Sequence, residues 1–259
     1  MNIDHLEKHE DVKPEHDDNK PPPYKSQDGF IKVPIVRGFT EIKPIFNDLF
    51  HLGVGSFICG GYARYCASPL VGHKLGRAGD VDIYSPTEKD FEIVREFYSK
   101  IGLIIKHEND MAITYQRQKE GFLRYCPPIQ LIKPLREGRV VAVGTMEEIL
   151  KNFDFTIVRT AIVNEHWVLA DADFIHDEEN KILRLKNIHC PISSTLRCMK
   201  YAAKGYWLPP MQALNLFLDW DNRSPDYRQD LIDFILRISK GERLTSEQID
   251  KFEALMRRD

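Results

Sequence analysis

Two segments set the architecture of this chain: Ile58-Cys59-Gly60-Gly61 and Asp80-Val81-Asp82-Ile83. A short apolar run that ends in two glycines is typical of a β-strand followed by a tight turn. In the second segment, acids alternate with apolar residues, which is the pattern of another strand. Residues two apart in a strand point to the same face, so the two carboxylates would project together. The segments therefore predict two strands that present a glycine turn and a pair of acids.

The paired acids predict a site for a divalent metal ion. Like charges on one face repel each other, and a cation between them removes that repulsion. Mg²⁺ prefers hard oxygen ligands and binds through one or two carboxylates together with substrate phosphates. Gly60 and Gly61 have no Cβ, so their backbone N–H groups could approach a polyphosphate closely. An acid-x-acid pair alone also occurs at solvated strand edges, and the glycine turn before it is what favours the metal site.

Apolar periodicity predicts a mixed α/β region over about residues 30–190. A helix is expected around Ile42 to Leu52, with Pro44 in its first turn, and Thr87 resembles the cap of another helix. Thr145 would cap a third, short helix, and the β-branched stretch Phe155 to Val163 is typical of a strand. The other expected strands are 56–59, 81–84, 103–107, 111–116 and 129–133.

The residues after 191 read as helical almost without interruption. Ser193 or Ser194 would cap a helix over 195–204, and further helices are expected at 210–219, 226–240 and 246–257. The fold class is therefore α+β, a mixed β-sheet with flanking helices followed by a small all-helical domain. The predicted division of the chain is an arm at 1–28, an α/β domain at 29–190 and a helical domain at 191–259.

Charge is distributed unevenly along the chain. The net charge is −3, but residues 1–28 contain four Lys and eight Asp or Glu, so the rest carries +1. This segment has few apolar residues, which predicts a disordered acidic arm. Its Pro21-Pro22-Pro23-Tyr24 string could bind the aromatic groove of a WW-type partner as a polyproline II helix, or it could be a stiff linker. The near-neutral remainder leaves room for a local phosphate site.

Composition and missing motifs exclude several classes of protein. No apolar run approaches the length of a membrane span, and the polar N-terminus does not resemble a secretory signal. The five Cys form no CxxC pair, which argues against disulfide and zinc frameworks. These features predict a protein of the reducing cytoplasm with no membrane partner. The sequence contains no HExxH motif, P-loop, nucleophile elbow or Rossmann fingerprint.

Three motifs, in order, resemble those of the DNA polymerase β nucleotidyltransferase superfamily. Gly60-Gly61-Tyr62-Ala63-Arg64 resembles the Gly-Gly-x-x-Arg opening of CCA-adding tRNA nucleotidyltransferases and bacterial poly(A) polymerases. Phe153-Asp154-Phe155-Thr156-Ile157 resembles their Arg-Arg-Asp-Phe-Thr-Ile motif. The run from Leu196 to Tyr206 resembles their Leu-Arg-x-x-Arg-Phe-Ala helix. The resemblance implies the nucleotidyltransferase fold for the α/β domain.

The resemblance also implies roles for single residues. Asp80 and Asp82 would hold Mg²⁺ or Mn²⁺, and Asp154 would complete the catalytic set. The remaining implied residues would bind the nucleotide: Gly60, Gly61, Arg64, Arg197, Lys200 and Lys204. An alternative without any function in catalysis or binding is that Asp154 caps a helix or turn. For Arg197, Lys200 and Lys204 the alternative is an ordinary solvated basic face of a helix.

The sequence departs from the family pattern at informative positions. Gln130 stands where a neighbouring strand often bears a third acid, and Phe153 replaces an Arg. The insertion from Ser68 to Gly79 lengthens the usual spacing. The residues after Gly205 are too few for the body and tail that grip tRNA, so CCA addition itself is not expected.

Two functions remain open from the sequence. The first is a metal-dependent enzyme that transfers a nucleoside monophosphate from an NTP, with ATP the first choice, to an acceptor hydroxyl on RNA, a small molecule or a protein. The second is an inactive nucleotide- or RNA-binding module that acts as an interaction protein. The intact Asp80 and Asp82 pair favours the enzyme, whereas Gln130 and Phe153 favour the module.

Overall fold

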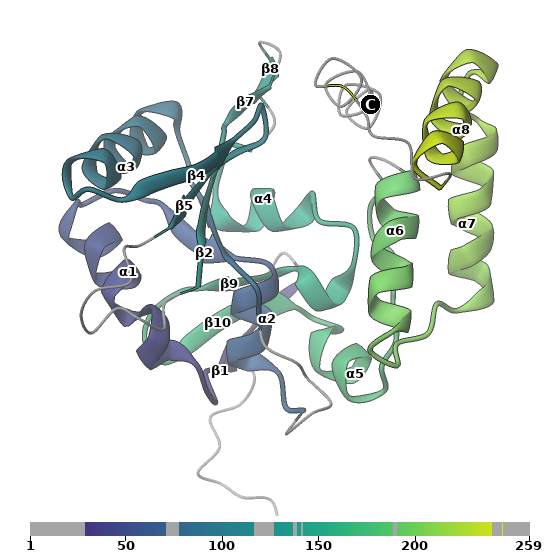
Figure 1. Cartoon of the computed structure of the whole chain (residues 1–259). Coiled ribbons are helices and arrows are strands. Elements are labelled where there is room, and N and C mark those ends of the chain that lie inside the picture. The colour runs from purple at the N-terminus through teal and green to yellow at the C-terminus, as the bar shows by residue number, and fades with distance from the viewer. Residues whose placement is uncertain are drawn as a thin grey trace, which may run out of the picture.

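The structure is a computed structural model that describes residues 29–70, 78–116, 127–136, 139–140, 142–188, 191–239 and 245. The acidic arm with Pro21-Tyr24, and the helix expected at 246–257, lie outside these residues. The chain forms a mixed β-sheet with helices on both faces, and a group of helices lies beyond one of those faces (Figure 1). The predicted fold class is therefore confirmed, while the exact domain boundaries stay predictions.

The sheet has eight strands in the order β1-β10-β9-β2-β3-β6-β5-β4. Strands β3 and β6 run parallel, and the other neighbouring strands pair antiparallel. Their bounds are β1 Phe30–Pro34, β2 Phe57–Cys59, β3 Val81–Tyr84, β4 Ile104–Glu108, β5 Ala112–Gln116, β6 Ile129–Ile132, β9 Thr160–Ile162 and β10 Trp167–Asp171. Strands β7 Leu135–Arg136 and β8 Arg139–Val140 form a separate two-stranded pair.

The two faces of the central strands differ in what covers them. Val81 and Ile83 of β3 are fully buried against α1 (Phe39–His51), α2 (Gly61–Ala67) and α3 (Glu88–Lys100) in the main apolar core. The opposite face packs in part on α4 (Met146–Lys151), whose Ile149 and Leu150 are buried. Because side chains alternate along a strand, Asp82 and Tyr84 project on this second face. Figure 1 shows α1 and α3 on one side of the sheet and α4 on the other.

The C-terminal helices are tied to the sheet domain by shared apolar packing. They are α5 Phe174–Glu179, α6 Pro191–Ala202, α7 Pro210–Asp221 and α8 Pro225–Ser239. Phe155, Ile157 and Leu183 form one buried cluster with Tyr201, Tyr206 and Leu216 of the helical part. This cluster fixes α6 opposite the second face of the sheet (Figure 1).

Several local predictions are confirmed by the structure. The Thr87 side chain accepts a hydrogen bond from the Asp90 backbone at the start of α3. Thr145 and Glu148 form a complete capping box at the start of α4. The strands expected at 56–59, 81–84, 103–107, 111–116 and 129–133 are all present within a residue or two.

Three local predictions are wrong. Pro44 lies inside α1 and not in its first turn, because the helix already begins at Phe39, after Gly38. The stretch Phe155 to Val163 is divided into a 3₁₀ helix, Thr156–Val158, and the short strand β9, because the Thr156 hydroxyl turns inward to the Asp177 carboxylate. Helix α6 begins at Pro191, so Ser193 and Ser194 lie inside it and neither is its cap.

The sequence patterns also missed five elements: β1, β7, β8, β10 and α5. β1 and β10 pair with each other at the edge of the sheet, with Phe30 opposite Asp171. None of the helices in the described ranges is long and apolar enough to cross a membrane.

Candidate nucleotide and metal site

The glycine turn after β2 has a conformation that only glycine adopts easily. Gly60 has φ +73° and ψ −136°, and its N–H and C=O are both bonded to Thr160 of β9, at 2.8 and 3.0 Å. A Cβ at this position would lie 3.3 Å from Oδ2 of Asp82 and 3.4 Å from the ring of Phe153. The absence of a side chain at Gly60 therefore lets the backbone approach both residues. Gly61 begins α2 with open space around it.

Strand pairing places Asp82 beside this turn. Asp82 is opposite Cys59 on β2 and in register with Gln130 on β6. Asp80 lies just before the strand. The structure therefore brings together the glycine turn and the two acids that the sequence singled out.

The Asp82 carboxylate is in an unfavourable position for a negative charge. Burial, and then the charge of Asp80, raise its pKa to about 7, although Lys200 and Arg197 act in the opposite direction. Within the described ranges no hydrogen bond or ion pair neutralises this carboxylate. A partly buried carboxylate that lacks a partner and faces a second one suits a bound cation, so these residues fit the Mg²⁺ or Mn²⁺ that the fold implies.

Gln130 stands where the sequence placed it, beside the acid pair. Its Nε2 donates a hydrogen bond to Oδ2 of Asp80, at 3.0 Å. One oxygen of Asp80 is thus oriented by a neutral amide. No cluster of three or more His, Cys, Asp or Glu suited to a metal occurs in the part of the chain that the structure describes. The candidate centre consequently has two carboxylates and one amide.

Asp154 is buried and its two oxygens are both engaged. Oδ2 accepts hydrogen bonds from Nη1 of Arg197 at 2.6 Å and from the Ser194 hydroxyl at 3.0 Å. Oδ1 accepts one from the backbone N–H of Phe155 at 3.1 Å. Asp154 therefore holds α6 and orients Arg197, which is a positioning role. Its direct participation in catalysis stays a prediction.

Helix α6 carries basic residues toward the acid pair. Arg197 and Lys200 are both close enough to Asp82 to lower its pKa. The Arg197 side chain is 53% exposed, so part of it remains available to a ligand while Nη1 holds Asp154. The basic stripe of the sequence is therefore not only a solvated helix face, because two of its members face the carboxylates.

Lys204 lies one turn further along. Its ammonium is 5.5 Å from the centre of the Tyr201 ring. Partial burial, followed by the charges of Arg64 and Lys200, lowers its pKa. These neighbours make Lys204 part of the same positive region.

Arg64 is committed to a buried ion pair. Its Nε and Nη2 donate to the two oxygens of Glu178 at 3.0 and 2.8 Å, and Nη2 also donates to the Tyr206 hydroxyl. The side chain is 5% exposed and lies against the ring of Tyr201. This geometry fixes α2 to α5 and to the helical part, and it supports the glycine turn indirectly. Because the guanidinium is already bonded to Glu178 and Tyr206, this geometry does not favour the predicted contact of Arg64 with the nucleotide.

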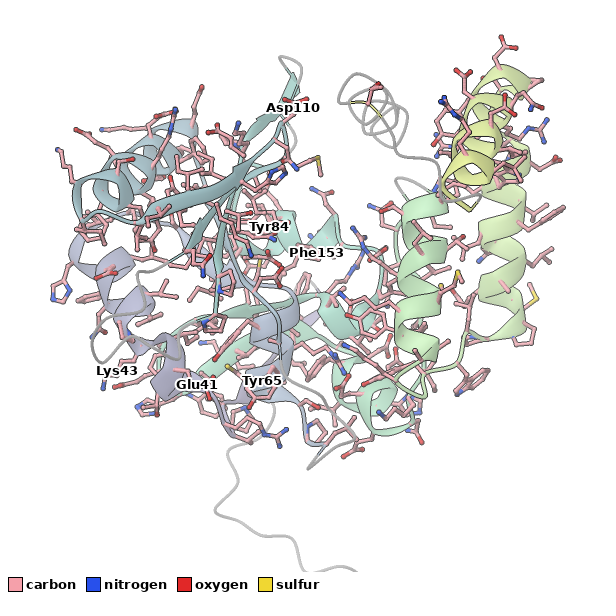
Figure 2. All side chains as sticks on the ribbon, viewed as in Figure 1. Glu41, Lys43, Tyr65, Tyr84, Asp110 and Phe153 are labelled. Atoms are coloured by element: carbon pink, nitrogen blue, oxygen red, sulfur yellow. The ribbon has the colours of Figure 1, made fainter. Side chains whose placement is uncertain are left out.

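Two aromatic residues beside the acids were not recognised as a pair from the sequence. Tyr84 follows Asp82 by two residues on the same face of β3, and its ring centre is 5.6 Å from that of Phe153. Figure 2 shows both side chains at the side of the sheet that faces α6. Only the strand alternation of Asp80, Asp82 and Tyr84 could have signalled Tyr84.

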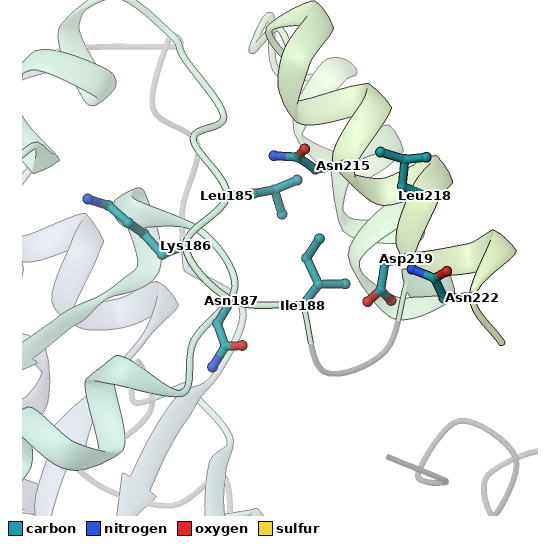
Figure 3. Close-up of a pocket in the computed structure, with 8 residues that line it drawn as sticks. All are labelled: Leu185, Lys186, Asn187, Ile188, Asn215, Leu218, Asp219 and Asn222. Carbon is teal, nitrogen blue, oxygen red and sulfur yellow. The ribbon is translucent and has the colours of Figure 1, made fainter.

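A pocket of about 420 Å³ lies elsewhere, between the segment after α5 and helix α7 (Figure 3). Its lining residues are Leu185, Lys186, Asn187, Ile188, Asn215, Leu218, Asp219 and Asn222. It shares no residue with the acid pair, the glycine turn or the basic stripe. The chemistry of the candidate site is therefore separate from this pocket.

Three solved structures that are similar to this chain are described as enzymes that act on tRNA or add CCA. The Bacillus stearothermophilus CCA-adding enzyme in complex with CTP is 19% identical, with a TM-score of 0.49, and the match covers 67% of this chain and 41% of that one. A tRNA-processing enzyme in apo form I is 18% identical, with a TM-score of 0.50, and the match covers 78% and 54%. A tRNA nucleotidyltransferase complexed with a primer tRNA and an incoming ATP analog is 18% identical, with a TM-score of 0.47, and the match covers 82% and 61%.

At these identities the likeness concerns the fold alone. The chain has the fold of the DNA polymerase β-type nucleotidyltransferases, as its three motifs predicted. It spans between 41% and 61% of the length of the three structures. Comparisons of the sequence found no matching protein-family model and no matching curated protein.

Proposed function

We propose that this protein is a metal-dependent nucleotidyltransferase, which transfers a nucleoside monophosphate from an NTP to an acceptor hydroxyl and releases pyrophosphate. One observation carries the proposal: Asp82, which has no hydrogen bond or ion pair among the described residues, lies beside Asp80 and the Gly60 turn, with Arg197 and Lys200 nearby. An acid pair suits a cation and the basic residues suit a polyphosphate. The same arrangement on this fold supports phosphoryl transfer.

Each residue has a distinct task in this proposal. Asp80 and Asp82 would hold Mg²⁺, or Mn²⁺, which when bound stabilises negative charge on the transferred phosphate and its leaving group. Arg197 and Lys200 bind the triphosphate, with Lys204 beyond them. Gln130 and Asp154 orient Asp80 and Arg197 respectively. Catalysis then depends on positioning and on charge stabilisation.

The substrates are proposed with support from the similar structures. Two of them are described with CTP or an ATP analog, and one with a primer tRNA. We therefore propose an NTP donor, with ATP the first to test, and an RNA end as the first acceptor. A reducing cytoplasm, the location that the sequence predicts, contains both.

A second candidate function is an inactive nucleotide- or RNA-binding module of the same fold. Gln130 favours it, because a neutral amide stands at the position of a third acid and cannot act as a general base. In this alternative the site binds metal and NTP without transfer.

The test is incubation of the full chain with each labelled NTP, Mg²⁺ or Mn²⁺, and RNA or protein acceptors. We expect label transfer that disappears in Asp80→Asn and Asp82→Asn. Asp226→Asn, an exposed acid on α8, is the matched control and should retain activity. Metal-dependent NTP binding without transfer to any acceptor would select the module. Absence of metal-dependent NTP binding would reject the site itself.

A further inference from the structure

We propose that Tyr84 and Phe153 form a stacking surface for the base of the bound nucleotide. This inference rests on the proposed function and names the part of the site that would hold the base. The ligand class is any purine or pyrimidine base, recognised through its π-face and not through its edges.

The position of Tyr84 comes from strand geometry. Asp80, Asp82 and Tyr84 alternate with the buried Val81 and Ile83, so the three share one face of the sheet. Residues two apart along a strand are separated by about 6–7 Å. The Tyr84 ring therefore lies one strand repeat from Asp82, one of the two carboxylates that would hold the metal.

Phe153 completes the surface from a different part of the chain. Its ring centre is 5.6 Å from that of Tyr84, with the ring planes at 49°. Its edge also approaches Gly60, next to Oδ2 of Asp82. Both rings are partly buried, so they are held by packing while each keeps some surface exposed. The aromatic pair is thus continuous with the glycine turn and the acids.

The charges around the rings suit a nucleotide. Tyr84 is near Arg197 of α6, and Arg197 lies close to both Asp82 and Asp154. A nucleotide whose phosphates meet Arg197 and Lys200 would have its base beside the rings. Stacking is tolerant of sequence because every base has a π-face. Phe153 stands where the motif that this chain resembles has an Arg. At this position the side chain can therefore stack on a base but cannot form an ion pair.

The test compares a nucleotide with a ligand that has no base. Dissociation constants of ATP and of inorganic tripolyphosphate, each with Mg²⁺, are measured by calorimetry for the full-length wild type, Phe153→Leu, Phe153→Tyr and Tyr84→Leu. We expect Phe153→Leu and Tyr84→Leu to bind ATP roughly 5- to 100-fold more weakly. Tripolyphosphate affinity should stay within about twofold, since no stacking is involved, and Phe153→Tyr should retain ATP affinity.

Phe46→Leu is the matched control, because Phe46 is also partly buried and paired with another ring, Phe39, on the far side of the sheet. It should change neither affinity. Thermal melting of each variant shows that it is folded under the conditions used.

The other outcomes are decisive. Equal weakening of ATP and tripolyphosphate would mean that the rings only support the fold, and unchanged ATP affinity would mean that they do not touch the base. The same titrations are repeated with CTP, GTP and UTP, and a loss confined to one of the four NTPs would indicate edge recognition. Each of these results overturns stacking, and wild-type binding of tripolyphosphate still supports the phosphate site. If the wild type binds neither ligand, the proposed function fails and the stacking surface fails with it.

Discussion

At the scale of single residues, the amide of Gln130 has the clearest consequence for the metal site. Its bond to Asp80 fixes one carboxylate oxygen without adding a charge. Groups that orient metal ligands in this way commonly change metal affinity or activity by 10- to 100-fold when they are removed.

We expect Gln130→Ala to weaken Mn²⁺ binding by about tenfold or more, because Asp80 would lose its orienting donor. The measurement is titration of free Mn²⁺ by electron paramagnetic resonance. Gln229→Ala, on the exposed side of α8, is the control and should not change the affinity. Unchanged affinity in Gln130→Ala would show that Asp80 does not depend on this bond.

The raised pKa of Asp82 predicts a pH-dependent stability in the metal-free protein. Its folded pKa of about 7 lies above the ordinary value of 3.8, so the folded state binds the proton more tightly than the unfolded state. This residue therefore lowers stability progressively as the pH rises from about 4 to about 7, and the loss is complete above that range.

Asp82→Asn should remove that loss and raise the free energy of unfolding at pH 8 by on the order of 1–3 kcal/mol, with little change near pH 4. Urea unfolding at both pH values, with a chelator present, measures the difference. If Asp82→Asn and the wild type have the same free energy of unfolding at pH 8, the Asp82 charge is not buried at a cost.

At the scale of elements, the buried Arg64–Glu178 pair joins α2 to α5. Removing one partner of a buried pair leaves an uncompensated charge, which typically costs about 3–5 kcal/mol. We expect Glu178→Gln to destabilise the fold by this order, measured by urea unfolding. The exposed pair of Lys100 with Glu96 provides the control, and Glu96→Gln should leave the free energy of unfolding nearly unchanged.

A similar loss in both variants would contradict the structural importance of the buried pair. The double variant Arg64→Met/Glu178→Leu should recover part of the loss, because no charge is then left unpaired.

Element prediction from the sequence succeeded where the signal is local. The capping residues Thr87 and Thr145, the apolar spacing of α1 and the alternation of β3 are all contained in a few consecutive residues. It failed where a distant side chain decides. Thr156 turns inward to Asp177, and Ser194 binds Asp154 instead of capping a helix.

The candidate site shows the same division. The acids, the glycine turn and Gln130 were found because motifs mark them, and the structure places them together. The pairing of Arg64 could not be found, because Glu178 is 114 residues away and carries no motif. The Tyr84 and Phe153 contact likewise depends on the packing of two separate segments.

At the scale of the whole molecule, the helical part is needed to bury the sheet domain's second apolar cluster. Phe155, Ile157 and Leu183 lose Tyr201, Tyr206 and Leu216 as neighbours if it is removed. We expect a chain that stops at Ile188 to show no cooperative thermal transition near that of the full chain.

Deletion of residues 1–28, the acidic arm expected from the sequence, is the control and should leave the melting temperature within about 2 °C of the wild-type value. Cooperative melting of the shorter chain at the wild-type temperature would show that the sheet domain is independent.

The long-range partners of Arg64 also bear on the order in which the protein matures on the ribosome. Its hydroxyl partner, Tyr206, follows it by 142 residues. At about 5–20 residues per second, synthesis of that interval takes roughly 7–30 s. During this time the guanidinium has no Tyr206 to bind, and for most of it no Glu178. The helix that begins at the glycine turn therefore reaches its final environment only after Tyr206 has been synthesised.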